Sequence, residues 1–111
     1  MFVQKDKMIE EDGVVLVKVT KTYEDGSKYV GTLNALNQKK HGKGKLTRSD
    51  GFEYEGEFKN GLRNGIGKYT MPDGFIYEGA WVDDQIQGTG VARYPTGQIY
   101  EGQFKQGVPH G

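Results

Sequence analysis

A tripeptide that recurs at a fixed interval constrains this chain more than any other feature. Tyr54-Glu55-Gly56, Tyr77-Glu78-Gly79 and Tyr100-Glu101-Gly102 begin 23 residues apart, and a fourth copy, Tyr29-Val30-Gly31, begins 25 residues before the first of them. A period of this length is typical of proteins built from stacked supersecondary units. The chain is therefore predicted to be a repeat array with units that start at residues 29, 54, 77 and 100, the last of them incomplete.

Other marks recur in phase with the tripeptide. An aromatic residue stands two positions after its glycine in three units, a Gly-x-Gly pair follows, and a turn glycine comes seven residues after that pair. The distance from the Gly-x-Gly pair to the next tyrosine is constant, so the extra residues of the first unit fall between Gly31 and Gly42. The stretch Asn34 to His41 is predicted to be a lengthened loop.

The pattern inside one unit is that of a β-strand. Residues 52–58 alternate, with Phe52, Tyr54, Gly56 and Phe58 on one face and three glutamates on the other, which indicates a strand. Asn-Gly and Pro-Asp-Gly sequences between such stretches are turn signals. The prediction is an all-β fold: a single-layer antiparallel meander of stacked β-hairpins, elongated and twisted, with about eight or nine short strands.

Turn geometry then predicts the register between neighbouring units. If each turn before a tyrosine is a three-residue loop with glycine in the left-handed conformation, Gly42 falls opposite Phe58, Gly65 opposite Trp81 and Gly88 opposite Phe104. A ring that lies across a glycine on the next strand covers exposed backbone. We therefore expect these residues to form structural aromatic–glycine pairs: Phe58, Trp81 and Phe104 with Gly42, Gly65 and Gly88.

The two ends of the array are expected to differ. Residues 1–13 precede the periodic part and are predicted to be a mobile arm, and residues 14–28 a capping strand and turn, since valines 17 and 19 replace the Gly-x-Gly pair there. Residues 29–111 form the predicted array. Gly111 occupies the first glycine of a pair, so the sequence is either a fragment of a longer array or leaves an edge strand near Phe104 that another chain covers.

Composition limits the classes of function. With 15 basic and 15 acidic residues the formal net charge is zero, which argues against general nucleic-acid binding. Two histidines and no cysteine leave too few groups for a catalytic constellation or a metal site, so we expect no enzyme activity, no metal and no cofactor. The lack of cysteine, of a signal peptide and of a long apolar stretch favours a cytoplasmic location.

A basic run over residues 38–48 is the strongest candidate for contact with anionic lipid. In the predicted register Lys45 faces Glu55 and Lys43 faces Glu57, which leaves Lys39 and Lys40 at the loop tip. Two lysines near an anionic surface contribute roughly 2 kcal/mol, too little for stable anchoring. Membrane binding is therefore an alternative hypothesis, with these candidate lipid contacts: Lys39, Lys40, Lys43, Lys45 and Arg48.

The tyrosines on the aromatic side of the sheet form the other candidate site. The sequence contains no second layer to cover them, and tyrosine is enriched among the residues that dominate binding energy at interfaces. We expect a concave groove that binds a partner protein, lined by Tyr54, Tyr69, Tyr77, Tyr94 and Tyr100.

The unit Tyr-Glu-Gly-x-(Phe/Trp)-x-x-Gly-x-x-x-Gly-x-Gly, with Asp-Gly before the next tyrosine, resembles the MORN (membrane occupation and recognition nexus) repeat. The resemblance extends from Tyr23 to Gly111; the first full unit departs from it, with Leu33 in place of the strand aromatic. It implies a hairpin array that acts as a scaffold or adaptor, found in cytoskeletal, ciliary and membrane-junction proteins and beside enzymes, with no catalysis by the repeats.

Three functions are compatible with these observations. The first is a structural or adaptor module that binds a protein partner through the aromatic groove, or assembles edge to edge or as a homodimer through the C-terminal strand, in a cytoskeletal or ciliary assembly. The second is a phosphoinositide- or membrane-binding module that uses the loop 38–48. The third is a regulatory or targeting segment of a larger enzyme.

Overall fold

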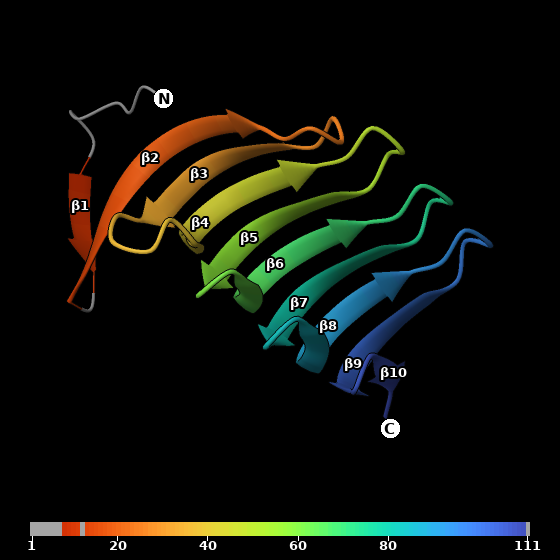
Figure 1. Cartoon of the computed structure of the whole chain (residues 1–111). Helices are drawn as coiled ribbons and strands as arrows, with labels where there is room; N and C mark the ends of the chain where they lie inside the picture. Colours follow the sequence, from red (N-terminus) through yellow and green to blue (C-terminus); the bar gives the residue numbers. More distant parts are fainter. Residues whose placement is uncertain (1–7, 12, 111) are drawn as a thin grey trace.

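The chain folds into one open antiparallel sheet whose strands follow each other in sequence order (Figure 1). The structure, a computed structural model, describes residues 8–11 and 13–110. Its ten strands are β1 (Met8–Glu11), β2 (Val14–Thr22), β3 (Lys28–Asn34), β4 (Lys40–Thr47), β5 (Glu53–Lys59), β6 (Leu62–Thr70), β7 (Ile76–Val82), β8 (Gln85–Arg93), β9 (Ile99–Lys105) and β10 (Val108–Pro109). The described part contains no helix that is long and apolar enough to cross a membrane. The predicted all-β single-layer meander is confirmed.

The strand count exceeds the predicted eight or nine because a short strand lies at each end. The segment Met8–Glu11, part of the predicted mobile arm, instead pairs with β2 along the apolar run that starts at Val14. Residues 1–7 and 12 lie outside the described residues. At the other end, Val108 and Pro109 pair with the last residues of β9. The molecule is elongated and thin, with extents of 44 × 31 × 18 Å.

The turns lie at the two ends of the strands and are of two kinds (Figure 1). The end with the longer turns is called the wide-turn edge below, and the opposite end the tight-turn edge. At the wide-turn edge, as in the turn after β4, Arg48 N donates to Phe52 O and Gly51 adopts a φ of 100°, as predicted for a loop with a left-handed glycine. At the tight-turn edge two residues with positive φ connect β5 to β6, β7 to β8 and β9 to β10, for example Asn60 and Gly61, whereas residues 35–39 form the longer loop between β3 and β4. The turn geometry therefore produces the predicted register: Gly42 is opposite Phe58, Gly65 opposite Trp81 and Gly88 opposite Phe104.

The rings do not lie over those glycines, however, so the predicted aromatic–glycine pairs are wrong. Gly42, Gly65 and Gly88 have φ values of 87°, 110° and 95° and lie where the strand pairing shifts. The atoms nearest to a Cβ built on Gly65 belong to the Glu57 carboxylate, and on Gly88 only Ala80 comes within 4 Å. A strand irregularity turns the backbone at these sites away from the rings.

The rings lie instead over the other glycines of each unit. These glycines face one another in an unbroken row across seven strands, from β3 to β9: Gly31, Gly44, Gly56, Gly67, Gly79, Gly90 and Gly102. The ring of Tyr54 lies over Gly67, and a Cβ on that glycine would overlap the ring. Tyr29 and Tyr77 cover Gly44 and Gly90 in the same way. The row exists because only glycine leaves room for a ring laid flat along the strand.

The tyrosines that cover these glycines are the centre of the core. Tyr29, Tyr54 and Tyr77 are 0% exposed, and each phenol donates to the carbonyl three residues further on, for example Tyr54 Oη to Glu57 O at 2.8 Å. The side of the sheet that carries them is called the aromatic face below, and the other side the polar face. Edge-to-face packing joins the rings, as between Tyr77 and Phe104 with centroids 5.0 Å apart, an arrangement that stabilises aromatic pairs.

The buried phenols predict how the fold responds to alkali. Burial raises the pKa of Tyr29, Tyr54 and Tyr77 above the ordinary tyrosine value, so the folded state favours the neutral phenol. The contribution of these phenols to stability should be constant below about pH 10, the unfolded-state pKa, and should be lost as pH rises above it. We expect the ionisation of these three phenols, followed by tyrosinate absorbance, to coincide with loss of structure followed by Trp81 fluorescence. Independent ionisation of all 7 tyrosines in a folded sheet would contradict the prediction.

Candidate functional site

The aromatic face carries rings that the core does not fully enclose. Tyr69, Phe75 and Tyr94 lie beside the wide-turn edge and are half-buried. Tyr69 packs edge-on against Trp81 with centroids 5.3 Å apart, and Phe75 packs against Tyr94 at 5.4 Å. These three residues, called the outer aromatic row, present ring surface to solvent on a backbone that the sheet holds rigid.

Cations from the first part of the chain stand over rings of this face. Lys40 Nζ lies 5.2 Å from the ring centroid of Tyr23, and Arg63 Cζ lies 4.6 Å from that of Trp81. Both distances are within the range of attractive cation–π contacts. The cations placed in this way are Lys21, Lys40, Arg48 and Arg63. The candidate site is therefore both aromatic and basic.

Backbone hydrogen bonds fix three equivalent positions along the tight-turn edge. Lys40, Arg63 and Ile86 are 23 residues apart, and the carbonyl of each accepts a hydrogen bond from the next tight turn at 2.8, 2.8 and 2.9 Å. The donors are the amides of Gly61, Asp84 and Gly107. Each tight turn thus fixes, by a backbone hydrogen bond, the start of the strand two places earlier in the sheet. The three side chains therefore project from equivalent backbone positions.

Arg63 is clamped by the next tight turn. Its Nε and its backbone N both donate to Asp84 Oδ1, at 2.8 and 2.9 Å. Partial burial raises the pKa of Asp84, but the hydrogen bonds and charge of Arg63 outweigh this and hold that pKa below its ordinary value, so the pair is charged at neutral pH. A hollow beside it is lined by Arg63, Tyr69, Trp81, Asp84, Ile86 and Gln106.

The clamp and the backbone conformation of Asp84 together predict different costs for two substitutions of this residue. This residue has a φ of 73°, in the left-handed region that glycine adopts without strain. Asp84→Ala keeps the strain and removes the clamp, so we expect a loss of about 1 to 2 kcal/mol, with the ion pair discounted for its exposure. Asp84→Gly also removes the clamp but relieves about 1 kcal/mol of strain. Urea unfolding should therefore rank Asp84→Ala below Asp84→Gly. The reverse order would show that the left-handed backbone carries little strain, and an Asp84→Ala variant as stable as the unchanged chain would show that the clamp contributes little.

The structure separates the tyrosines of the predicted groove into two groups. The prediction that Tyr54 and Tyr77 line a groove is wrong, because both side chains are 0% exposed and their hydroxyl groups donate to backbone carbonyls. Tyr69, Tyr94 and Tyr100 are half-buried on the aromatic face, where a partner can reach them. Their role in binding stays a prediction.

The basic run 38–48 does not form one surface. Lys40 and Arg48 stand over rings of the aromatic face, whereas Lys43 and Lys45 lie on the polar face, in register with Glu57 and Glu55 as predicted. The ion pair of Lys45 is made with a different carboxylate, Oε1 of Glu53, at 3.8 Å. Lys39 is exposed. The alternation of the strand divides the positive charge between two sides of the sheet.

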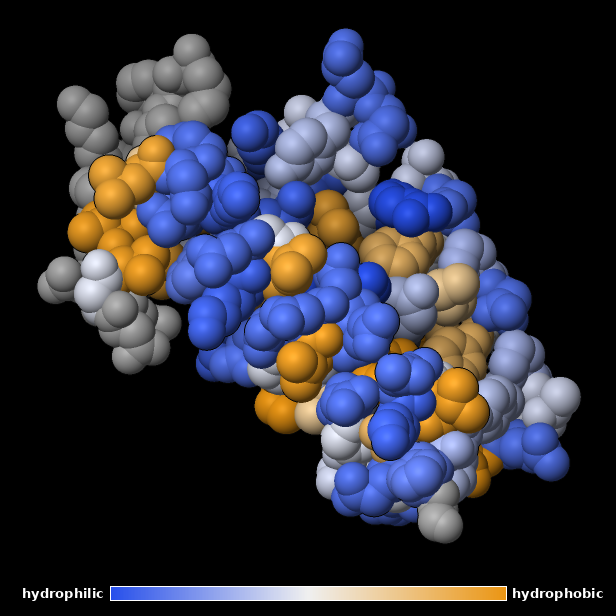
Figure 2. Space-filling view, turned by 60° about the horizontal axis from the view of Figure 1, so that its bottom comes forward, coloured by the Kyte–Doolittle hydropathy of each residue, from blue (hydrophilic) through white to orange (hydrophobic). Residues whose placement is uncertain are grey.

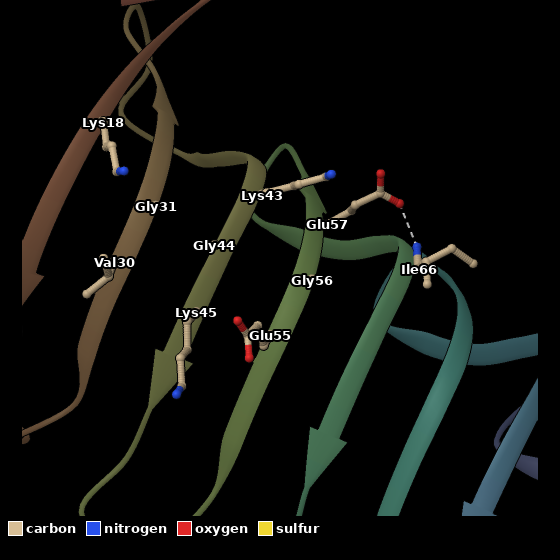
Figure 3. A pocket seen from close by; sticks show the side chains of 10 residues that line it. All are labelled: Lys18, Val30, Gly31, Lys43, Gly44, Lys45, Glu55, Gly56, Glu57 and Ile66. Carbon is tan, nitrogen blue, oxygen red and sulfur yellow. Dashed lines mark hydrogen bonds between the residues drawn. The ribbon is translucent and has the colours of Figure 1, made fainter. Parts of the chain in front are cut away.

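The polar face is hollowed over β2 to β6. Figure 3 shows lysines and glutamates of neighbouring strands lining this hollow, with Glu57 accepting a hydrogen bond from the backbone of Ile66 at 2.6 Å. The Glu57 carboxylate therefore provides an acceptor for a backbone amide within the strand irregularity at Gly65. Figure 2 shows one larger apolar patch at the N-terminal end of the sheet and, elsewhere, smaller apolar spots between hydrophilic side chains. Opposite charges in neighbouring strands leave this face with little net attraction for an anion.

Sequence reasoning missed Arg63, Phe75 and Ile86 as members of the aromatic face. The 23-residue period could have identified Arg63 and Ile86, since they are the equivalents of Lys40 in the next two units. The strand irregularity at Gly65 hid this, because alternation extended from the regular part of the strand through Gly65 gives the wrong face for the residues beside the tight turn. Among the residues that the structure describes, no group of His, Cys, Asp and Glu side chains is arranged to hold a metal ion.

Comparison with known proteins agrees with this architecture. The family model of the MORN repeat matches residues 38–52, 54–75, 77–99 and 100–111. The MORN repeat-containing protein 4 homolog of Drosophila melanogaster is 50% identical over 40 residues, which cover 36% of this chain and 20% of that protein. The chain thus matches about a fifth of the length of this relative.

Proposed function

The chain belongs to the MORN repeat family, whose repeats are non-catalytic modules for interaction with proteins or membranes, and we propose that it is a non-enzymatic adaptor that binds a partner protein through its aromatic face. A cytoplasmic location, in a cytoskeletal or ciliary assembly, is part of this proposal. The proposal also includes extension of the assembly at the sheet edge near β9, by a partner or by a second copy.

The outer aromatic row carries this proposal. Tyr69, Phe75 and Tyr94 expose ring surface beside a closed core, and the neighbouring Arg63 is positioned by Asp84. Tyrosine and arginine dominate the energetics of protein interfaces. A rigid sheet presents them without the ordering cost that a flexible loop would add on binding.

Two substitutions of matched chemistry on opposite faces test the proposal. Tyr94→Glu places a charge in the outer aromatic row, and Ile99→Glu places one on the polar face, where Ile99 is 59% exposed. Affinity purification of the chain and both variants from cell extract, followed by mass spectrometry, should identify a protein that Tyr94→Glu loses and Ile99→Glu retains. Loss with Ile99→Glu alone would move the binding site to the polar face and overturn the proposal.

Binding of anionic lipid through the loop 38–48 has less support. Lys43 and Lys45 face glutamates, and Lys40 is directed toward tyrosine rings, so few lysines are available to a planar surface. We expect the chain to stay in the supernatant when phosphatidylserine vesicles are pelleted at physiological salt, where roughly 2 kcal/mol from two lysines is insufficient. Salt-sensitive pelleting that Lys39→Glu abolishes would favour the membrane function instead.

A further inference from the structure

The aromatic face changes character along the array. The four cations that stand above its rings all come from the chain between Lys21 and Arg63, whereas among the described residues after Arg63 no lysine or arginine is placed above a ring. The three equivalent positions at the tight-turn edge show this change directly, as they are occupied by Lys40, Arg63 and then Ile86. The first two units are therefore basic at this position and the third is apolar.

The positive charge of the first half is only partly neutralised. Arg48 and Arg63 form ion pairs with Asp50 and Asp84. Within the described residues, Lys40 has no carboxylate oxygen within 4.0 Å. Its ammonium group lies over tyrosine rings, which attract it without cancelling its charge. An anionic group placed against this part of the face would meet an uncompensated charge in a partly desolvated setting.

The spacing of the two cations is set by the sheet. Lys40 begins β4 and Arg63 lies near the start of β6, two strands further along, which separates their backbones by about 10 Å. The hydrogen bonds from Gly61 and Asp84 hold both backbones in place. Beyond Arg63, in the direction of β9, the tight-turn edge continues with Ile86 and with the hollow that Ile86 lines together with Tyr69 and Gln106.

From this arrangement, which rests on the proposed function, we infer the chemistry and direction of the partner. The partner segment crosses the strands with one carboxylate over Lys40 and a second over Arg63. Aliphatic or aromatic side chains follow and pack against Ile86 and the ring of Tyr69, which line one hollow. The acidic end points toward β2 and the apolar end toward β9, so the face accepts the segment in one direction.

Selection of peptides against the chain tests this inference without knowledge of the natural partner. A random library of 16-residue peptides is displayed on phage and selected against the immobilised full chain. Enriched peptides should carry acidic residues in one half and apolar residues in the other. A spin label at the acidic end should broaden NMR signals of β2 to β4, and a label at the apolar end those of β8 and β9.

Two charge reversals on the same strand provide the matched control. Lys40→Glu should weaken binding of an enriched peptide about tenfold or more, since it replaces attraction with repulsion, and changing the acidic residues of the peptide to lysine should restore it. Lys43→Glu, on the polar face, should leave affinity unchanged. Lys40→Gln, with Trp81 fluorescence as a check of folding, separates loss of charge from loss of structure.

The outcomes distinguish the inference from the function on which it rests. Enriched peptides that lack acidic residues but are lost with Tyr94→Glu would overturn the inference and leave the aromatic face as the binding site. Failure to enrich any peptide sensitive to Tyr94→Glu or Lys40→Glu would overturn both. A dimer of the chain that Lys40→Glu dissociates, or displacement of the peptide by anionic vesicles, would assign the face to a second copy or to lipid and overturn the inference.

Discussion

Replacement of Gly67 by alanine is expected to destabilise the protein by about 3 kcal/mol or more, at the upper end of the cost of overpacking. The added Cβ would overlap the ring of Tyr54, which is 0% exposed and hydrogen-bonded to the carbonyl of Glu57. The ring has no free space to enter, because Phe58 and Trp81 pack against it with centroids 5.0 and 5.3 Å away. Urea unfolding followed by Trp81 fluorescence measures the change.

Gly65→Ala, two residues earlier on the same strand, is the control. There the nearest atoms belong to the carboxylate of Glu57, a flexible group on the polar face that can move into solvent. The φ of 110° still makes alanine unfavourable, so we expect a loss of about 1 to 2 kcal/mol. If Gly65→Ala proved more destabilising than Gly67→Ala, the rings would not pack on the glycine row.

The fold and the register could be predicted from the sequence because both depend on periodic, local signals. Glycines in the wide turns fix the loop type, and the loop type fixes which residues face each other. Gly42 therefore lies opposite Phe58, and Lys45 opposite Glu55, as expected. The same register already places Gly44 opposite Gly56, so the glycine row was implicit in the pattern.

The direction of a side chain along a strand is a different kind of information. Tyr54 lies flat toward the carbonyl of Glu57, and this choice depends on the absence of side chains at Gly56 and Gly67 and on the rings that pack against it. A hydrophobic pattern specifies which face a residue occupies, but both the core tyrosines and the outer row occupy the aromatic face. Burial therefore had to come from the structure, and with it the correction of Tyr54 and Tyr77.

Strand irregularities account for the other differences. The pairing shifts around Gly65 and its equivalents, so the residues between each of these glycines and the preceding tight turn lie on a face that simple alternation does not predict. This brings Arg63 opposite Phe58 and Ile86 opposite Trp81. The gradient from basic to apolar along the aromatic face is visible only once this shift is known.

Tyr77→Ala is expected to cost about 3 to 5 kcal/mol, the range for removal of a large buried aromatic side chain. The ring covers Gly79 and Gly90 and packs edge-on against Trp81 and Phe104, with centroids 5.6 and 5.0 Å away. Its removal opens a cavity between two units and leaves the carbonyl of Ala80 without its donor. Circular dichroism during thermal unfolding should show a large fall in the midpoint.

Two further variants separate the causes. Tyr77→Phe removes only the hydroxyl group and should cost about 1 kcal/mol, while Tyr94→Ala, in the half-buried outer row, should cost less than Tyr77→Ala because solvent already reaches its ring. A midpoint for Tyr77→Ala equal to that of Tyr94→Ala would place Tyr77 outside the core. If the expected order holds, loss of a partner on mutation of Tyr77 reports unfolding, and only the outer aromatic row and Lys40 can be used to map the binding face.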